Sequence, residues 1–408
     1  PGPNPISALT LTSDNTTSTD IAADTITVQT LPAAVTATLA GGAGSDTFNI
    51  LAISGAATIN AGADGDTINV SSDAPVNGGT VDGIVGALTV NGDAGSDTLN
   101  VSDLGDVSGD SGTLSASSIT GLGNAGAITY AVDVLNLDLG LGADTLLVTG
   151  THAGTTTVDG NGGSDTFNIQ ATGGTTTINA GAGNDTFNIS SDAPANTGTL
   201  DGIVGALTVN GGGHDAATRS VHAGGRMVDN SPFISQPSQA AAALLPTKAP
   251  PYDVFSFMEF QDPVITAAPV GTTSTVPVGD TLNLVDRGDA SDNDYQVTSA
   301  QLARGGGPAV SYTGIELTNL VAGTGDDQVK IVLPEAAGPV LPAVITVDGT
   351  SGSDNVSITG SSGSDAIEVG VLTTDPSVRS PVEVTNIDCL KITGDRKTTL
   401  QNSITAVA

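Results

Sequence analysis

Residues 155–189 read TTTVDGNGGSDTFNIQATGGTTTINAGAGNDTFNI, and this stretch is one unit written twice. Each unit consists of a Thr-rich strand, a glycine turn, an Asp and the alternating strand DTFNI. Asp165 and Asp185 are 20 residues apart, and the same spacing separates Asp46 from Asp66. A short, fixed period of this kind is the signature of stacked repeats.

The strand in each unit alternates with period two. Thr166 and Asn168 therefore face one way, and Phe167 and Ile169 face the other. One unit has too little apolar surface to offset its ordering entropy, whereas stacked units bury a continuous apolar column. We therefore expect an all-β fold, a parallel β-solenoid of the β-helix or β-roll type, with Thr and Asn ladders that hydrogen-bond along its axis.

The glycine turns contain the candidate metal-binding residues. Residues 41–49, GGAGSDTFN, fit the calcium-binding nonapeptide G-G-x-G-x-D-x-U-x, in which U is a large apolar residue. Glycines allow positive φ and let carbonyl oxygens point inward, while Asp supplies a short carboxylate. Calcium takes about six to eight oxygen ligands, so one turn is too few and two stacked turns are needed.

The sequence here resembles hemolysin-type (repeat-in-toxin) calcium-binding proteins and, more loosely, the giant repeat-rich surface proteins of bacteria. The resemblance implies Ca²⁺ as the bound cofactor. Ala61 and Ala180 depart from its pattern at the first glycine, and Asp64 departs from it at the fourth position. The alternative is that Gly and Asp only form tight turns, as they do in any β-solenoid. The predicted calcium-binding residues are Gly42, Gly44, Asp46, Asp64, Asp66, Gly95, Asp97, Asp144, Gly163, Asp165, Gly183, Asp185, Asp327, Asp354 and Asp365.

Internal duplications divide the chain into four parts: a lead-in at 1–40, acidic repeats at 41–213, an insertion at 214–278 and C-terminal repeats at 279–408. The segment at 71–92 returns at 190–211, a shift of 119 residues, and Asp97 returns as Asp280, a shift of 183. The insertion is aromatic-rich around residues 252–260. It is either a segment that contacts another molecule or a loop that lies on its own solenoid. A third interpretation is an error in the sequence.

Charge is distributed unevenly. The formal net charge is −33, and residues 1–213 contain 21 Asp but no Glu, Lys or Arg. Nucleic acid and anionic membranes are therefore poor partners for this half, and divalent cations are good ones.

Cys389 is the only cysteine, so a disulfide within the chain is excluded. No apolar run reaches about 18 residues, so we expect no membrane span. No signal peptide is visible, and the opening PGPNPIS is typical of a mature or excised segment.

Three function hypotheses follow. The leading one is a non-enzymatic, extracellular or cell-surface structural protein: a calcium-stabilised rod that self-associates into a fibre, surface layer or matrix. The second is an adhesin segment that binds surface glycans or ice, which requires that residues 155–157 and 175–177 form an exposed flat Thr face. The third is a polysaccharide lyase, which needs a basic residue beside an acidic cluster. Arg287 and Arg304 are among the candidates, and the sequence shows no Asp cluster with them.

Overall fold

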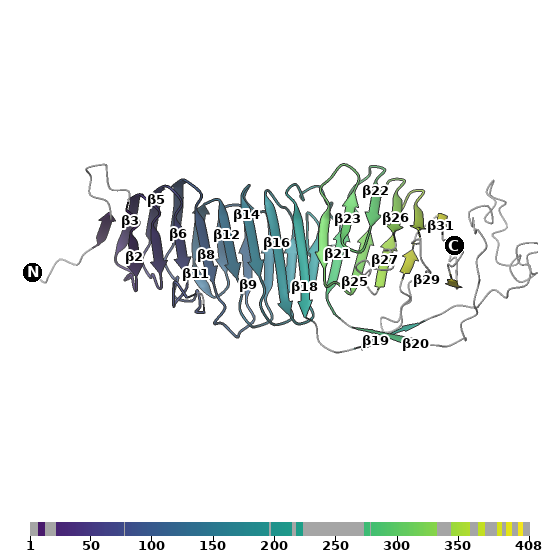
Figure 1. Cartoon of the computed structure of the whole chain (residues 1–408), viewed down its shortest axis with the longest axis horizontal. Helices are drawn as coiled ribbons and strands as arrows, with labels where there is room; N and C mark the ends of the chain where they lie inside the picture. Colours follow the sequence, from purple (N-terminus) through teal and green to yellow (C-terminus); the bar gives the residue numbers. More distant parts are fainter. Residues whose placement is uncertain are drawn as a thin grey trace, which may run out of the picture. The chain divides into compact units, whose positions relative to one another are not determined.

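The computed structural model describes residues 7–12, 22–76, 78–195, 197–213, 218–222, 273–277, 279–332, 344–359, 366–371, 382–385, 389–393 and 399–402. All regular elements among these residues are strands, and most are paired in parallel (Figure 1). The expectation of an all-β, parallel β-solenoid is confirmed. Among the described residues there is no helix that is long and apolar enough to cross a membrane.

The chain divides into two compact units. The N-terminal unit comprises Pro1–Asn196, Leu200–Asp215 and Val310–Gly314, and the C-terminal unit comprises Thr197–Thr199, Ala216–Ala309 and Ile315–Ala408. Of the predicted insertion, the described strands are β19 (Thr218–His222) and β20 (Thr273–Pro277), which pair antiparallel. Its aromatic stretch at 252–260, and Asp365, lie outside the described residues.

In the N-terminal unit the chain passes back and forth between two sheets, so one coil contributes one strand to each. The first sheet has the order β1 (Ala8–Thr12), β3 (Thr36–Ala43), β5 (Ala57–Ala63), β7 (Leu88–Ala94), β11 (Asn124–Ala131), β10 (Ser118–Gly121), β9 (Ser111–Leu114), β13 (Thr145–Val148), β15 (Thr166–Ile169), β17 (Thr186–Ile189). The second sheet has the order β2 (Thr25–Val28), β4 (Thr47–Ile50), β6 (Thr67–Val70), β8 (Thr98–Ser102), β12 (Val134–Asp138), β14 (Thr155–Asp159), β16 (Thr175–Ala182), β18 (Leu207–Gly213), β24 (Val310–Thr313).

Stacking places like residues in register, as the repeat predicted. Phe167 of β15 pairs with Phe187 of β17, and Asn168 pairs with Asn188. The two Phe rings are stacked with their centroids 5.2 Å apart, and both side chains are fully buried. The apolar column between the sheets is therefore built from the inward positions of successive strands.

The asparagines form a ladder along the axis. The Nδ2 of Asn69 donates to Oδ1 of Asn49 at 3.0 Å, and the Nδ2 of Asn100 donates to Oδ1 of Asn69 at 2.9 Å. The ladder was expected, and its members Asn49 and Asn69 are each only 5% exposed. Each amide lies between neighbouring coils in register, which shields it from solvent.

One coil of the N-terminal unit is elaborated. The interval between Asp97 and Asp144 is 47 residues, longer than the 20 residues that separate Asp165 from Asp185. In this interval β9, β10 and β11 extend the first sheet, with β10 antiparallel to both neighbours. Strands β11 and β9 then resume parallel pairing with β7 and β13.

The C-terminal unit repeats this design. One sheet has the order β21 (Thr281–Val285), β25 (Leu317–Val321), β27 (Val344–Asp348), β30 (Val382–Thr385), β29 (Ala366–Val371), β32 (Thr399–Asn402). The other has the order β23 (Gln301–Arg304), β22 (Asp294–Val297), β26 (Gln328–Val332), β28 (Asn355–Thr359), β31 (Cys389–Thr393). Strands β22 and β23 are antiparallel, as β9 and β10 are in the N-terminal unit.

Candidate metal centre

The predicted Asp residues lie at the turns that lead into strands, and they form ladders of their own. On the second sheet of the N-terminal unit, the backbone N–H of Asp46 donates to Oδ1 of Asp66 at 2.7 Å, and the N–H of Asp66 donates to Oδ1 of Asp97 at 2.9 Å. Neighbouring coils are thus joined through the carboxylate of one and the backbone of the other.

The same ladder occurs at the other turns. On the first sheet, the N–H of Asp144 donates to Oδ1 of Asp165 at 2.8 Å, and the N–H of Asp165 donates to Oδ1 of Asp185 at 2.8 Å. In the C-terminal unit the N–H of Asp327 donates to Oδ1 of Asp354 at 2.9 Å. In each of these pairs, one oxygen of the accepting carboxylate therefore receives a hydrogen bond from the backbone N–H of an adjacent coil.

All of these ladder carboxylates are buried, with exposures of 0 to 2%. The second oxygens of Asp66, Asp165 and Asp327 are buried and accept no hydrogen bond. Burial raises the pKa of Asp66 and Asp327 to about 6, and that of Asp165 to about 7. A buried carboxylate oxygen without a donor is costly while it is charged, so these oxygens favour either a proton or a cation.

The turn glycines take the conformation that the nonapeptide requires. The predicted glycines all have positive φ, namely Gly42 (106°), Gly44 (112°), Gly95 (146°), Gly163 (113°) and Gly183 (142°). Asp64, at the fourth position of its turn, also has a positive φ of 78° and is exposed. A Cβ at Gly41 would lie 2.3 Å from Oδ2 of Asp46, so the first glycine makes room for the carboxylate.

The described residues contain one group of three acidic, His or Cys side chains whose ligand atoms all lie within 4.8 Å of one another: Asp103, Asp106 and Asp110. The nonapeptide pattern does not include this group, which we call the Asp103 cluster. The predicted calcium residues form ladders of neighbours and not such a triad. The available signal was DLGDVSGD at 103–110, which recurs as DRGDASDN at 286–293.

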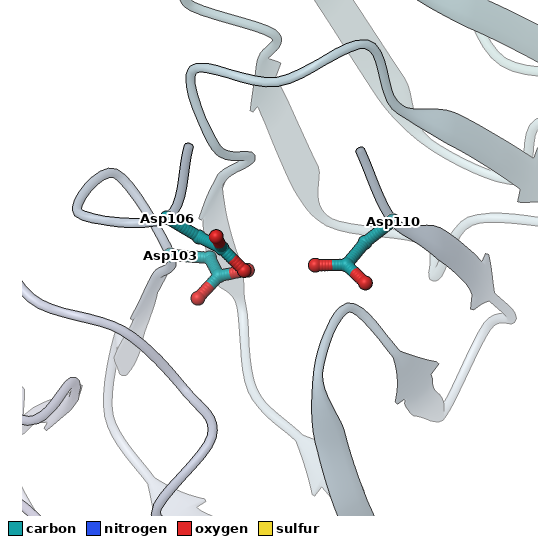
Figure 2. Close-up of side chains that lie close together, drawn as sticks. All are labelled: Asp103, Asp106 and Asp110. Carbon is teal, nitrogen blue, oxygen red and sulfur yellow. The ribbon is translucent and has the colours of Figure 1, made fainter. Parts of the chain in front are cut away.

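The Asp103 cluster sits where β8 turns into β9. Asp103 follows β8, is 1% exposed, and its Oδ1 accepts the N–H of Val81 at 2.9 Å. Oδ1 of Asp106 accepts the N–H of Ser108 at 2.7 Å. Figure 2 shows the carboxylates of Asp103 and Asp106 together, with the carboxylate of Asp110 pointing toward them from the opposite side.

Within the described part of the chain, no Lys or Arg forms an ion pair with the Asp103 cluster. Oδ2 of Asp110 is buried and accepts no hydrogen bond. Burial raises the pKa of Asp103 to about 7, and neighbouring carboxylates add to the rise. Burial also raises the pKa of Asp110. Residues 1–213 contain no Lys or Arg, so that stretch supplies no ammonium or guanidinium group to offset these carboxylates.

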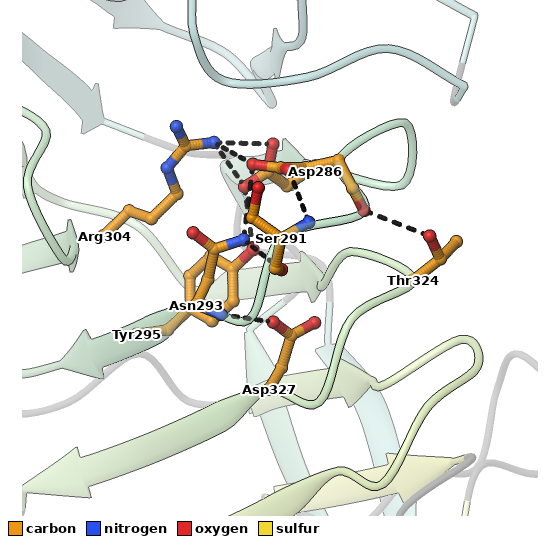
Figure 3. A network of polar contacts seen from close by, with 8 residues as sticks. Asp286, Ser291, Asn293, Tyr295, Arg304, Thr324 and Asp327 are labelled. Carbon is orange, nitrogen blue, oxygen red and sulfur yellow. Dashed lines mark hydrogen bonds and ion pairs between the residues drawn. The ribbon is translucent and has the colours of Figure 1, made fainter.

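Arg304 of the C-terminal unit lies beside an acidic pair (Figure 3). Its Nη1 donates to the two carboxylate oxygens of Asp286 at 2.9 and 2.8 Å, and to Oδ2 of Asp289 at 3.1 Å. The hydroxyl of Tyr295 donates to Oδ2 of Asp286 at 2.7 Å. The structure thus places an Asp pair around an arginine. The sequence pattern did not indicate this arrangement, because Arg304 lies on β23, well beyond the turn that holds both Asp residues. Asp286 is fully buried and ion-paired, which is typical of a structural network.

The Thr-rich stretches do not form a fully outward face. Thr155 and Thr175 are exposed and in register, but Thr156 is fully buried and Thr176 is 1% exposed. The outward row therefore contains only every second Thr of these two stretches.

Comparison with protein-family models, curated proteins and solved structures finds no match to this chain. The hemolysin-type resemblance therefore stays a prediction.

Proposed function

We propose that this chain is a non-enzymatic structural protein of the cell exterior, a calcium-stabilised β-solenoid that self-associates into a fibre, surface layer or matrix. The observation that carries the proposal is the set of buried turn carboxylates in residues 1–213, a region that contains no Lys or Arg. Buried charges need partners, and an oxygen-rich, nitrogen-poor set of donors suits a hard divalent cation.

Calcium fits these residues on chemical grounds. The second oxygens of Asp66, Asp165 and Asp327 are buried without hydrogen-bond donors, and each lies in a turn whose partner turn stacks one coil away. Calcium accepts irregular arrangements of carboxylate and carbonyl oxygens. When bound, it would neutralise charge that otherwise opposes stacking of the coils. Extracellular calcium is abundant enough to fill sites of modest affinity, which favours a location outside the cell.

Self-association is supported by the strand edges. Strand β1 pairs with β3 and with no other strand among the described residues, and all five of its residues are exposed. Leu9 and Leu11 on this strand are 46% and 43% exposed. An edge strand with apolar side chains is a template for pairing with another chain.

Electron microscopy and sedimentation of the purified chain in calcium, and then in excess EDTA, test this function. We expect elongated assemblies in calcium that dissociate on chelation and form again when calcium returns. Monodisperse single chains at every calcium concentration would refute the self-association. Release of unsaturated products from acidic polysaccharides would refute the non-enzymatic assignment.

A further inference from the structure

The Asp103 cluster has a counterpart in the C-terminal unit. Adding 183 residues to Asp103, Asp106 and Asp110 gives Asp286, Asp289 and Asn293. The local geometry is the same in both. Oδ1 of Asp106 accepts the N–H of Ser108 at 2.7 Å, and Oδ1 of Asp289 accepts the N–H of Ser291 at 2.8 Å.

The strands beside the two clusters also correspond. The N–H of Asp110 donates to Oδ1 of Asp144 at 2.7 Å, and the N–H of Asn293 donates to Oδ1 of Asp327 at 2.8 Å. Gly112 of β9 pairs with Gly121 of β10, just as Tyr295 of β22 pairs with Arg304 of β23. The two turns are therefore one structural site in two versions.

The C-terminal version contains its own cation. Three donors converge on the carboxylates of Asp286 and Asp289: the Arg304 guanidinium, the Tyr295 hydroxyl and the Asn293 amide, whose Nδ2 lies 3.3 Å from Oδ2 of Asp289. Two carboxylates and one guanidinium give this site a formal charge of −2 + 1 = −1. The network in Figure 3 is thus held together by a positive charge from the chain itself.

The N-terminal version lacks all three donors. Glycines stand at the positions of Tyr295 and Arg304, and Asp110 replaces the amide of Asn293 with a third carboxylate. A Cβ at Gly112 would lie 2.6 Å from Cδ2 of Leu122, a side chain that is 1% exposed, so Leu122 occupies space next to this strand. Leu122 therefore supplies apolar packing at this position of the N-terminal version, but it does not replace the positive charge of Arg304.

We propose that the Asp103 cluster is a divalent-cation site, which Ca²⁺ fills through Asp103, Asp106 and Asp110, at the place where the C-terminal unit uses the guanidinium of Arg304. A divalent ion changes the formal charge from −3 to −3 + 2 = −1, the same value as in the C-terminal version. Ligand oxygens within 4.8 Å of one another can share one ion whose oxygens lie about 2.3 to 2.6 Å away. The inference rests on the proposed calcium-stabilised function, but it uses residues outside the predicted nonapeptide turns.

Calcium binding to the full chain, measured by equilibrium dialysis and calorimetry with Ca²⁺ alone, tests this site. Asp110→Asn copies the residue that the C-terminal version already carries, so the fold should tolerate it. We expect this variant to lose one calcium equivalent, or to bind it at least about tenfold more weakly. Asp106→Asn should give the same loss. The matched control is Asp289→Asn, which alters the version that holds Arg304 and should bind as much calcium as the wild type.

Wild-type stoichiometry and affinity in both Asp110→Asn and Asp106→Asn, with circular dichroism unchanged, would overturn the site. An equal loss in Asp289→Asn would also overturn it, because the effect would then be one of net charge. If the wild type binds calcium and responds to chelation while these variants match it, the cation site at the Asp103 cluster is refuted and the proposed function is not. If the wild type neither binds calcium nor responds to chelation, both the site and the proposed function are refuted.

Discussion

Replacement of Asp165 by Asn removes one buried charge while keeping the shape of the side chain. The Oδ1 of Asn can still accept the Asp144 N–H, which lies 2.8 Å from Oδ1 of Asp165. The second oxygen of Asp165 is buried and accepts no hydrogen bond. In EDTA, where no cation offsets the charge, we therefore expect Asp165→Asn to be more stable than the wild type at pH 8.

The size and the pH range follow from the pKa. Burial raises the pKa of Asp165 from 3.8 to about 7. This shift means that ionising Asp165 costs about 4 kcal/mol more in the folded state than in the unfolded state. A new buried amide without a partner costs about 2 kcal/mol, so the net gain is about 2 kcal/mol. The folded state binds the proton more tightly than the unfolded state. Wild-type stability therefore falls as pH rises from about 4 to about 7, and the advantage of the variant appears over that window.

Urea unfolding in EDTA at pH 4, 6 and 8, followed by circular dichroism, measures this difference. Asp93→Asn is the matched control, because it removes the same charge from an exposed residue with a positive φ of 69°, a conformation that Asn tolerates. The control should differ from the wild type by less than about 0.5 kcal/mol. A variant that is less stable than the wild type at pH 8 in EDTA would show that the Asp165 carboxylate is not strained by burial.

Substitutions at three further positions test the packing and the buried ion pair. Phe187→Ala should cost about 3 to 5 kcal/mol in urea unfolding, because Phe187 is fully buried and stacks on Phe167; a loss below about 1 kcal/mol would contradict that packing. Arg304→Ala should cost about 3 to 5 kcal/mol, because it leaves the carboxylate of Asp286 buried without its cation, and Arg304→Lys should recover part of the loss. Gly62→Ala should lower the thermal midpoint clearly, because Gly62 has a φ of 122° and a Cβ there would lie 2.0 Å from a backbone oxygen of the adjacent coil; an unchanged midpoint would refute that close approach.

The repeat itself made much of the fold predictable. The 20-residue spacing of Asp165 and Asp185 correctly indicated that Phe167 and Phe187 stack in register. The lead-in strands β1 and β2 also consist of short alternating segments, ALTLT and TITV. Period-two alternation and turn glycines are local patterns, so they can be recognised in the sequence wherever the coils are regular.

The elaborated coil was harder to predict. Strands β9 and β10 contain SGTL and SITG, short segments with glycine and little apolar content, which resemble loops. Their pairing depends on neighbours that are distant in sequence, such as β13, and single-sequence patterns do not record that.

The candidate site showed the same limit. The nonapeptide pattern located the ladder residues such as Asp66 and Asp165, because glycine spacing marks the turns. It did not indicate the N–H donors from adjacent coils, which occupy one oxygen of each carboxylate. Asp103 was missed because its turn lacks the glycine pattern. The related turn that begins at Asp286 lies 183 residues further along the chain, a distance that no local pattern spans.

The most direct test of the account is the urea stability of the wild-type chain at pH 8 in calcium and in EDTA. If cations offset the buried carboxylates, the unfolding midpoint should be clearly higher in calcium, and the fall in stability between about pH 4 and about pH 7 should occur only in EDTA. Equal midpoints in calcium and EDTA, with the same pH dependence in both, would contradict the central claim that the acidic unit is stabilised by calcium.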